Sequence, residues 1–217
     1  MPLIIRPATL ADAPALSRIC LLTAAAGRNA EPKYVFGELP GYIWAEPYVH
    51  ITGCTWGFVL ADDTAAPGEH GTDAVKGYIL GATDTRAFEA RAEANWWPPI
   101  RARFPLVADG ERKEGDEMCI GILHRGPDPA LEACIAFSPA HMHIDLLPEV
   151  QRQGWGRKLI GHAVRYLREK GLSTLWLGLD LANEDANKFY RRLGFEPIEG
   201  APDNLLGLRF DTATWAE

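Results

Sequence analysis

The hydrophobic positions follow two different periods along the chain, and together they predict a domain of the α/β (α+β) class. Six short runs of aliphatic and β-branched residues have the spacing of strands. These expected strands are residues 3–6, 55–61, 75–83, 141–147, 174–179 and 205–210. Other segments carry apolar residues on one helical face. These expected helices are residues 9–20, 85–104, 154–170 and 184–193.

Local signals indicate how several elements begin, end and connect. Thr9 with Asp12 three residues later resembles a capping box that opens the first helix. Pro98 and Pro99 are expected to break the helix that starts near residue 85. The stretch 24–50, rich in glycine, proline and aromatic residues, predicts irregular helices.

Two connections decide the expected topology. The polar segment 61–71 is of the kind that joins a hairpin, so the strands 55–61 and 75–83 are expected to pair antiparallel. Residues from approximately 85 to 139 form a long insertion between the third and fourth strands, which we expect to be helical.

Composition narrows the possible functions. The 217 residues, 47% of them hydrophobic, are enough for the core of a single domain over 1–217. The net charge of −7 and the pI near 5.4 argue against nucleic acid as the main partner, because counterion release requires a concentrated positive surface. The four cysteines form no CxxC pair, so no zinc or other metal site and no disulfide framework is expected. No stretch approaches the ~18 apolar residues of a membrane span, and we expect a cytoplasmic protein.

The most informative segment is 143–159, where a strand is followed by a polar turn with two glycines and then by a helix. Gly154 and Gly156 leave room for a ligand beside the backbone, while the unpaired amides and positive dipole end of the helix attract phosphate oxygens. Nearby positive charge comes from Arg152, Arg157 and Lys158. The residue types alone therefore predict a phosphorylated ligand on 151–158. The alternative is a turn that uses glycine only for tight packing.

Two better-known phosphate motifs do not fit the segment. There is no GxxxxGK[ST] sequence, and no GxGxxG opens a unit with an acidic residue downstream. A mononucleotide P-loop is therefore not expected.

The turn also resembles a family signature. Gln151-Arg152-Gln153-Gly154-Trp155-Gly156, with LeuLeuProGlu before it, is similar to the (Q/R)xxGx(G/A) motif of GNAT acetyltransferases. The resemblance implies acetyl-CoA as cosubstrate, with the amides of 153–158 on the coenzyme A pyrophosphate and backbone groups near Leu146 and Leu147 on the pantetheine arm. Trp155 departs from the usual aliphatic residue. The implied cofactor-binding residues here are Leu146, Leu147, Gln151, Arg152, Gln153, Gly154, Trp155, Gly156, Arg157 and Lys158.

A second segment, 183–195, resembles the N-x-x-A-x-x-(F/L)-Y-x-x-x-G-F sequence of the same family. By that resemblance Tyr190 lies by the thioester sulfur and protonates the departing thiolate, Asn183 orients the thioester, and Asn187 contacts pantetheine. The residue pattern alone leaves other readings open. Tyr190 has the helical spacing of a core aromatic, and Asn183 is a favoured helix cap.

Transfer to an amine also requires a base, because amines with a pKa near ~10 are charged at neutral pH. His141, His143 and Asp145 alternate along the strand that enters the glycine turn, so they share one face of it. We expect Asp145 first and His143 second to act as base or substrate anchor. The alternative is a hydrogen-bonded His/Asp pair that only supports the strand.

Three further residues have two readings each. Trp96 and Trp97 either wall the acceptor pocket or form a local core, and Asp84 either anchors a cationic substrate or caps the following helix.

The resemblance covers most of the chain, because 4–16 also looks like the first strand and helix of GNAT proteins. The implied GNAT fold is a mixed, mostly antiparallel twisted sheet of about seven strands flanked by helices, with the helical insertion between strands three and four. The whole pattern resembles the acetyltransferase-like C-terminal domain of O-GlcNAc hydrolases and its free-standing bacterial relatives.

The implied activity is acetyl-CoA-dependent N-acetyl transfer by direct attack of an amine in a ternary complex, in a monomer or homodimer. The alternative is an acyl-CoA-binding pseudo-acetyltransferase with a regulatory or interaction role. A small amine, an aminoglycoside, a peptide N-terminus and a lysine all stay open as acceptors.

Overall fold

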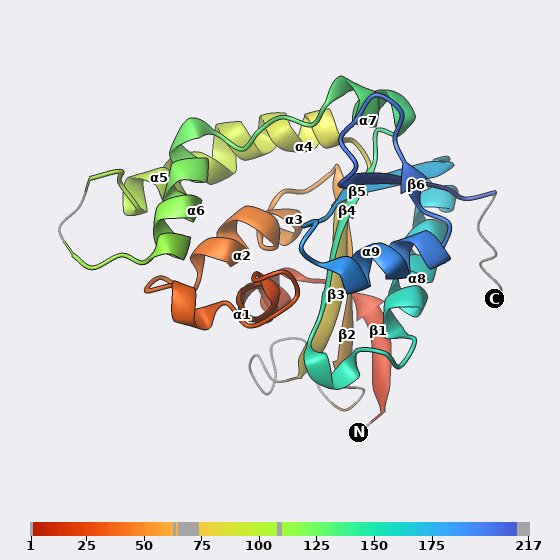
Figure 1. Ribbon diagram of the computed structural model, residues 1–217, viewed down its shortest axis with the longest axis horizontal. Coiled ribbons are helices and arrows are strands. Elements are labelled where there is room, and N and C mark those ends of the chain that lie inside the picture. Colours follow the sequence, from red (N-terminus) through yellow and green to blue (C-terminus); the bar gives the residue numbers. More distant parts are fainter. Residues whose placement is uncertain (1, 63, 65–73, 108–109, 212–217) are drawn as a thin grey trace.

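The computed structural model describes residues 2–62, 64, 74–107 and 110–211. Its centre is one seven-stranded sheet in the order β1-β2-β3-β4-β5-β7-β6 (Figure 1). Every neighbouring pair is antiparallel except β4 and β5, which are parallel. The strands are β1 Leu3–Pro7, β2 Thr55–Asp62, β3 Val75–Ala82, β4 His141–Leu146, β5 Thr174–Gly178, β6 Glu196–Pro197 and β7 Leu205–Arg209.

Helices cover the sheet and fill the long connection between β3 and β4 (Figure 1). The α-helices are α1 Ala13–Thr23, α2 Leu39–Trp44, α3 Pro47–His50, α4 Thr85–Arg91, α5 Trp97–Arg103, α6 Glu114–Arg125, α7 Glu132–Phe137, α8 Trp155–Glu169 and α9 Glu184–Arg192. Short 3-10 turns lie at Leu10–Asp12, Glu31–Lys33 and Pro148–Val150, and a π-helical turn at Ala92–Trp96.

The two faces of the sheet bury different helices. The apolar side of α8, including Leu159, Ile160 and Val164, packs in one cluster with Tyr190 of α9 and strand residues. On the other face Leu16, Ile19 and Cys20 of α1 pack against Tyr78 and Leu80 of β3. A third cluster joins residues before β2, including those of α2 and α3, to the helices of the insertion, and this shared cluster is called the insertion core below.

The expected strands and their antiparallel pairing are confirmed, and β6 is an additional strand that the sequence patterns missed. The capping box is confirmed too: the Asp12 carboxylate accepts from the Thr9 amide at 2.8 Å, and it pairs with Arg6 at 2.7 Å. The hairpin connection 61–71 falls mostly on residues 63 and 65–73, which lie outside the described residues.

The expectation that Pro98 and Pro99 break a helix was wrong. The chain passes from α4 through the π-helical turn at Ala92–Trp96 into α5, which begins at Trp97 with proline in its first turn. Proline is tolerated there because the first amides of a helix have no intrahelical acceptor.

The pairing of β4 with β5 is confined to one end. The recorded register is His141↔Trp176 alone, where the Trp176 amide donates to the carbonyl of Ala140 at 3.1 Å. Beyond that pair β4 continues to Leu146 beside β3, and within the described residues it has no further register with β5. The two parallel strands therefore diverge toward the end of β4 at which the glycine turn begins.

Two further observations concern the cysteines and the length of the helices. All four cysteines are buried and free. Among the described helices, none combines the length and the apolar character that crossing a bilayer requires.

Candidate functional site

The glycine turn between β4 and α8 has a left-handed backbone at two positions. Gly154 has φ of +83° and Arg152 has φ of +59°. A Cβ on Gly154 would meet no atom within 4 Å, so glycine is needed there for its conformation and not because the site is crowded. The space beside its α-carbon is open to a ligand.

The turn is held by its own glutamines. Gln151 Nε2 donates to the carbonyl of Leu146 at 2.8 Å, and Gln153 Nε2 donates to the carbonyl of Glu149 at 2.7 Å. The first helical bond of α8 runs from the Lys158 amide to the carbonyl of Gly154 at 3.1 Å. The amides before it lie in the first turn, where an α-helix offers no acceptor, so they can receive an anion.

Basic side chains lie beside this turn but are only loosely held. Arg152 is exposed and its guanidinium lies 3.3 Å from the Asp185 carboxylate, an ion pair that solvent screens. Lys158 Nζ lies 4.1 Å from the centre of the Trp155 ring. Trp155, which stands where the family usually has an aliphatic residue, therefore holds a cation in the first turn of α8.

Gly156 serves packing. A Cβ at this position would lie 3.0 Å from Phe189 Cζ and 3.6 Å from Leu146 Cδ1, so its absence lets α8 approach α9 and β4. The reading that glycine is used for packing therefore describes Gly156, while Gly154 sets the backbone of the turn.

The backbone groups at the end of β4 differ in their hydrogen-bond partners. The Leu147 amide donates to Lys76 at 2.9 Å and its carbonyl accepts from Val150 at 3.1 Å, so both groups already have partners. Because backbone groups alternate sides along a strand, those of Ile144 and Leu146 are directed toward the diverging β5 instead. The Leu146 carbonyl on that side already accepts from Gln151 Nε2 at 2.8 Å.

Helix α9 presents the second predicted set. Asn183 caps it by accepting from the Ala186 amide at 3.1 Å, and the amide nitrogen of the Asn183 side chain lies against Gly27 of the loop after α1. Asn187 accepts from Arg191 Nε at 3.3 Å. The expected cap role of Asn183 is thus observed.

Tyr190 is both a core residue and an accessible phenol. Its ring is buried, with Phe189 and Phe195 at centroid distances of 5.3 Å. Its hydroxyl has no hydrogen-bond partner among the described residues. Because the hydroxyl is not one of the enclosed polar atoms without a partner, its oxygen is accessible. Burial, and after it the Asp145 carboxylate, raise the pKa of Tyr190, so the hydroxyl stays protonated at neutral pH.

His141, His143 and Asp145 lie opposite Ala82, Leu80 and Tyr78 of β3, so they share the face toward α1. They differ in environment.

His141 is buried, and its ring nitrogens lie 2.8 Å from Tyr48 Oη and 2.7 Å from Thr85 Oγ1. Burial, and to a lesser degree His143, lower the pKa of His141 to about 3. This residue is neutral and ties β4 to the insertion.

Asp145 and His143 are partly exposed and adjacent. Tyr78 Oη donates to Asp145 Oδ2 at 2.6 Å, and His143 Nε2 lies 3.0 Å from the same oxygen. That nitrogen is enclosed and makes no aligned hydrogen bond, so the contact with Asp145 is close but poorly directed. The two side chains are therefore close neighbours and not a hydrogen-bonded pair.

Cys20 lies beside this pair. Its Sγ, one His143 nitrogen and one Asp145 oxygen lie within 4.8 Å of one another, a donor set of the kind that binds zinc. Burial, with a smaller contribution from Asp145, raises the pKa of the Cys20 thiol, which disfavours the thiolate that a metal would need.

The other predicted residues lie apart from this cluster. Asp84 caps α4 by accepting from the Ala87 amide at 2.9 Å. Trp97 is buried in the insertion core, whereas Trp96 donates to the carbonyl of Tyr42 at 2.8 Å and lines a cavity of about 380 Å³ with His50.

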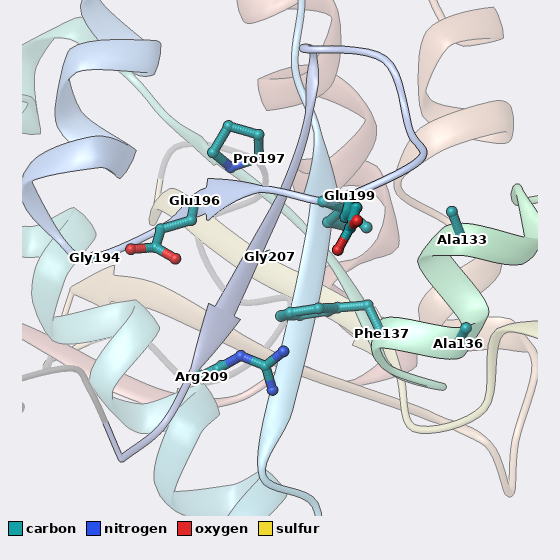
Figure 2. A pocket seen from close by; sticks show the side chains of 10 residues that line it. Ala133, Ala136, Phe137, Gly194, Glu196, Pro197, Glu199, Gly207 and Arg209 are labelled. Atoms are coloured by element: carbon teal, nitrogen blue, oxygen red, sulfur yellow. The ribbon is translucent and has the colours of Figure 1, made fainter.

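A second cavity, of about 400 Å³, lies between α7 and the β6–β7 pair. Figure 2 shows Phe137 and Arg209 beside each other on one side of it and Glu196 on β6. None of the predicted site residues lines it.

The sequence patterns missed Tyr78 and Cys20. Both residues read as ordinary core positions, and only the register of β3 against β4 and the packing of α1 bring them to Asp145.

The protein thus combines a mixed sheet, two parallel strands that diverge, and a glycine turn at the start of the helix after the first of them. Comparison with known proteins identifies the class. Residues 84–195 match the model of the acetyltransferase (GNAT) family. The chain belongs to this family, and the sheet with its flanking helices is the expected GNAT fold.

Individual relatives differ in how much of the chain they resemble. The crystal structure of SsHAT superposes with a TM-score of 0.81 at 34% identity, covering 97% of this chain and 99% of that one. The structure of AtaTR bound with AcCoA has a TM-score of 0.52 at 16% identity over 97% and 95%, a likeness of fold alone. The ribosomal protein bS18-alanine N-acetyltransferase of Escherichia coli (strain K12) is 44% identical over 48 residues, 22% of this chain and 32% of that protein. The match thus spans about a third of that relative's length.

Proposed function

We propose that this protein is an acetyl-CoA-dependent N-acetyltransferase that transfers the acetyl group directly to an amine in a ternary complex. The observation that carries the proposal is the gap between β4 and β5. The anion-binding turn follows β4, Tyr190 lies on the helix after β5, and Asp145 lies on the diverging half of β4.

In this proposal the cofactor follows the gap. The pyrophosphate binds the amides of residues 153–158, and the pantetheine arm extends along Ile144 and Leu146 toward Asn187 and Asn183. The AcCoA held by AtaTR, a protein of the same fold, supports this choice of cosubstrate.

In the proposed reaction, side chains of this protein act as the proton acceptor and the proton donor. The amine nitrogen attacks the thioester carbonyl, the C–N bond forms, and the C–S bond breaks to release the thiolate. The amine proton passes to Asp145, directly or through His143 or water, and Tyr190 protonates the thiolate. The raised pKa of Tyr190 means that this hydroxyl carries its proton before transfer.

The test is Tyr190→Phe, measured by thiol release from acetyl-CoA across amine classes. The change deletes the proton donor but keeps the ring that packs on Phe195. General acids contribute about 10²- to 10⁴-fold, so turnover should fall within that range while the acetyl-CoA Kd from calorimetry changes little. Tyr166→Phe, a phenol lost from the body of α8, is the control and should keep wild-type turnover.

The outcomes separate the alternatives. Wild-type turnover in Tyr190→Phe would limit Tyr190 to its core role. Tight acetyl-CoA binding without turnover on any amine would instead favour the acyl-CoA-binding pseudo-acetyltransferase.

Several narrower statements belong to the same proposal. We infer one domain over 1–217 with 85–139 as its insertion, which the full-length likeness to SsHAT supports. The proposed relationship to the acetyltransferase-like domain of O-GlcNAc hydrolases rests on the resemblance of the whole sequence pattern. A cytoplasmic location agrees with the four free cysteines, since disulfides are rare in that compartment.

A further inference from the structure

A buried phenol lies directly behind the predicted base. Tyr78 is fully buried on β3, where its backbone is in register with Asp145. Its hydroxyl donates to Asp145 Oδ2 at 2.6 Å, the length of a charge-assisted O–H···O bond. On its other sides the ring packs in the cluster of α1 beside Leu16 and Cys20. The phenol therefore has one fixed position from which to hold the carboxylate.

The two oxygens of Asp145 have different roles in the structure. Both recorded contacts, from Tyr78 and from His143, fall on Oδ2. Oδ1 has no partner among the described residues. It is also not one of the enclosed polar atoms that lack a hydrogen bond, so it is accessible. Oδ1 is thus the oxygen that reaches accessible space and is free to accept a proton from a ligand.

We propose that Tyr78 is a positioning residue that fixes Asp145 through Oδ2 and so directs Oδ1 at the acceptor amine. This inference rests on the proposed function, because it needs Asp145 as the base. Without the phenol, the carboxylate would lose this well-aligned hydrogen bond and could rotate toward His143.

The test compares Tyr78→Phe with Tyr34→Phe and Asp145→Asn. Tyr34 is the matched control, because it is also a buried phenol, lies 3.7 Å from Cys119 Sγ, and belongs to the insertion core. The readouts are the acetyl-CoA Kd and, on one amine acceptor, kcat and KM.

For Tyr78→Phe we expect kcat to fall by about 10- to 100-fold with an unchanged acetyl-CoA Kd, the range for a lost hydrogen bond to a charged group. Tyr34→Phe should keep the wild-type kcat. A Tyr78→Phe enzyme with wild-type kcat would overturn the inference.

A crystal structure of Tyr78→Phe supplies the readout that does not depend on turnover. A rotated Asp145 carboxylate supports the positioning role even if no amine is acetylated. The absence of acetylation would then count against the proposed function alone. An unmoved carboxylate in an inactive protein overturns the inference. If Tyr78→Phe does not fold, 4-fluorophenylalanine at position 78 keeps the shape of the tyrosine ring but removes the hydroxyl donor. Its kcat must then fall, and a wild-type kcat overturns the role.

Discussion

His141 makes the stability of the fold depend on acid in a way that can be calculated. This imidazole is buried on β4 and joined to Tyr48 and Thr85, so it couples the strand that carries Asp145 to the insertion. Burial first, and then the neighbouring His143, lower the pKa of His141 to about 3, against 6.5 for an ordinary histidine.

The sign follows from proton binding. In the unfolded chain the imidazole binds a proton below pH 6.5, whereas in the folded chain it does so only near pH 3. Between these values the unfolded chain binds more protons, so the free energy of unfolding falls as the pH falls. At about 1.4 kcal/mol per pH unit, lowering the pH to about 5 removes roughly 2 kcal/mol, a large part of a typical stability of about 5–15 kcal/mol.

The assay is urea unfolding followed by the fluorescence of the seven tryptophans, at about pH 7.5 and about pH 5. His141→Gln should be less stable than wild type at the higher pH, because the ring contacts are lost. It should lose about 2 kcal/mol less than wild type between the two pH values, since glutamine does not titrate. His162→Gln is the control, and its effect should be smaller because His162 is less buried. An equal acid loss in wild type and His141→Gln would refute the reasoning.

Two further variants test the cofactor side. Gly154→Ala should weaken acetyl-CoA binding by at least ~10-fold, because its Cβ enters the space over the turn. The control is Gly171→Ala at the other end of α8, which has φ of +80° and an equally open site, and which should cost similar stability without changing the Kd. Equal Kd values for the two variants would show that the ligand does not bind at the turn. Asn183→Ala should destabilise the protein by about 1 kcal/mol through the lost cap, and Asn183→Asp should restore that stability. Calorimetric melting and thiol release on both variants then decide whether Asn183 also acts on the thioester, since a cap alone predicts wild-type turnover in Asn183→Asp.

Much of the fold was predictable because its signals are local. The alternation of His141, His143 and Asp145 and the apolar face of α8 require only neighbouring residues to be recognised, and both agree with the structure. The β6 strand was missed because two residues, Glu196 and Pro197, give no periodicity. The effect of Pro98 was misjudged because a π-helical turn before it lets the helix restart.

The site was less predictable, because its decisive contacts cross the sheet. Tyr78 and Asp145 are separated by the whole insertion, and their pairing depends on the register between β3 and β4. No spacing in the chain reveals that register. Cys20 reaches the same place through the packing of α1, which is set by the complete cluster around Leu16 and not by a motif.

The structure also explains why the core and functional readings of one residue are hard to separate. Tyr190 has a ring in the core and a hydroxyl without a partner, and Asn183 caps α9 with its oxygen while its amide nitrogen lies against Gly27. The two-sided environments of Tyr190 and Asn183 follow from the packing of α9 beside the gap between β4 and β5. A helix at that place buries one part of each side chain and exposes another. Substitutions that remove whole side chains therefore confound stability with chemistry. Changes of a single atom or group, such as Tyr→Phe and Asn→Asp, are the ones that can assign a role in this site.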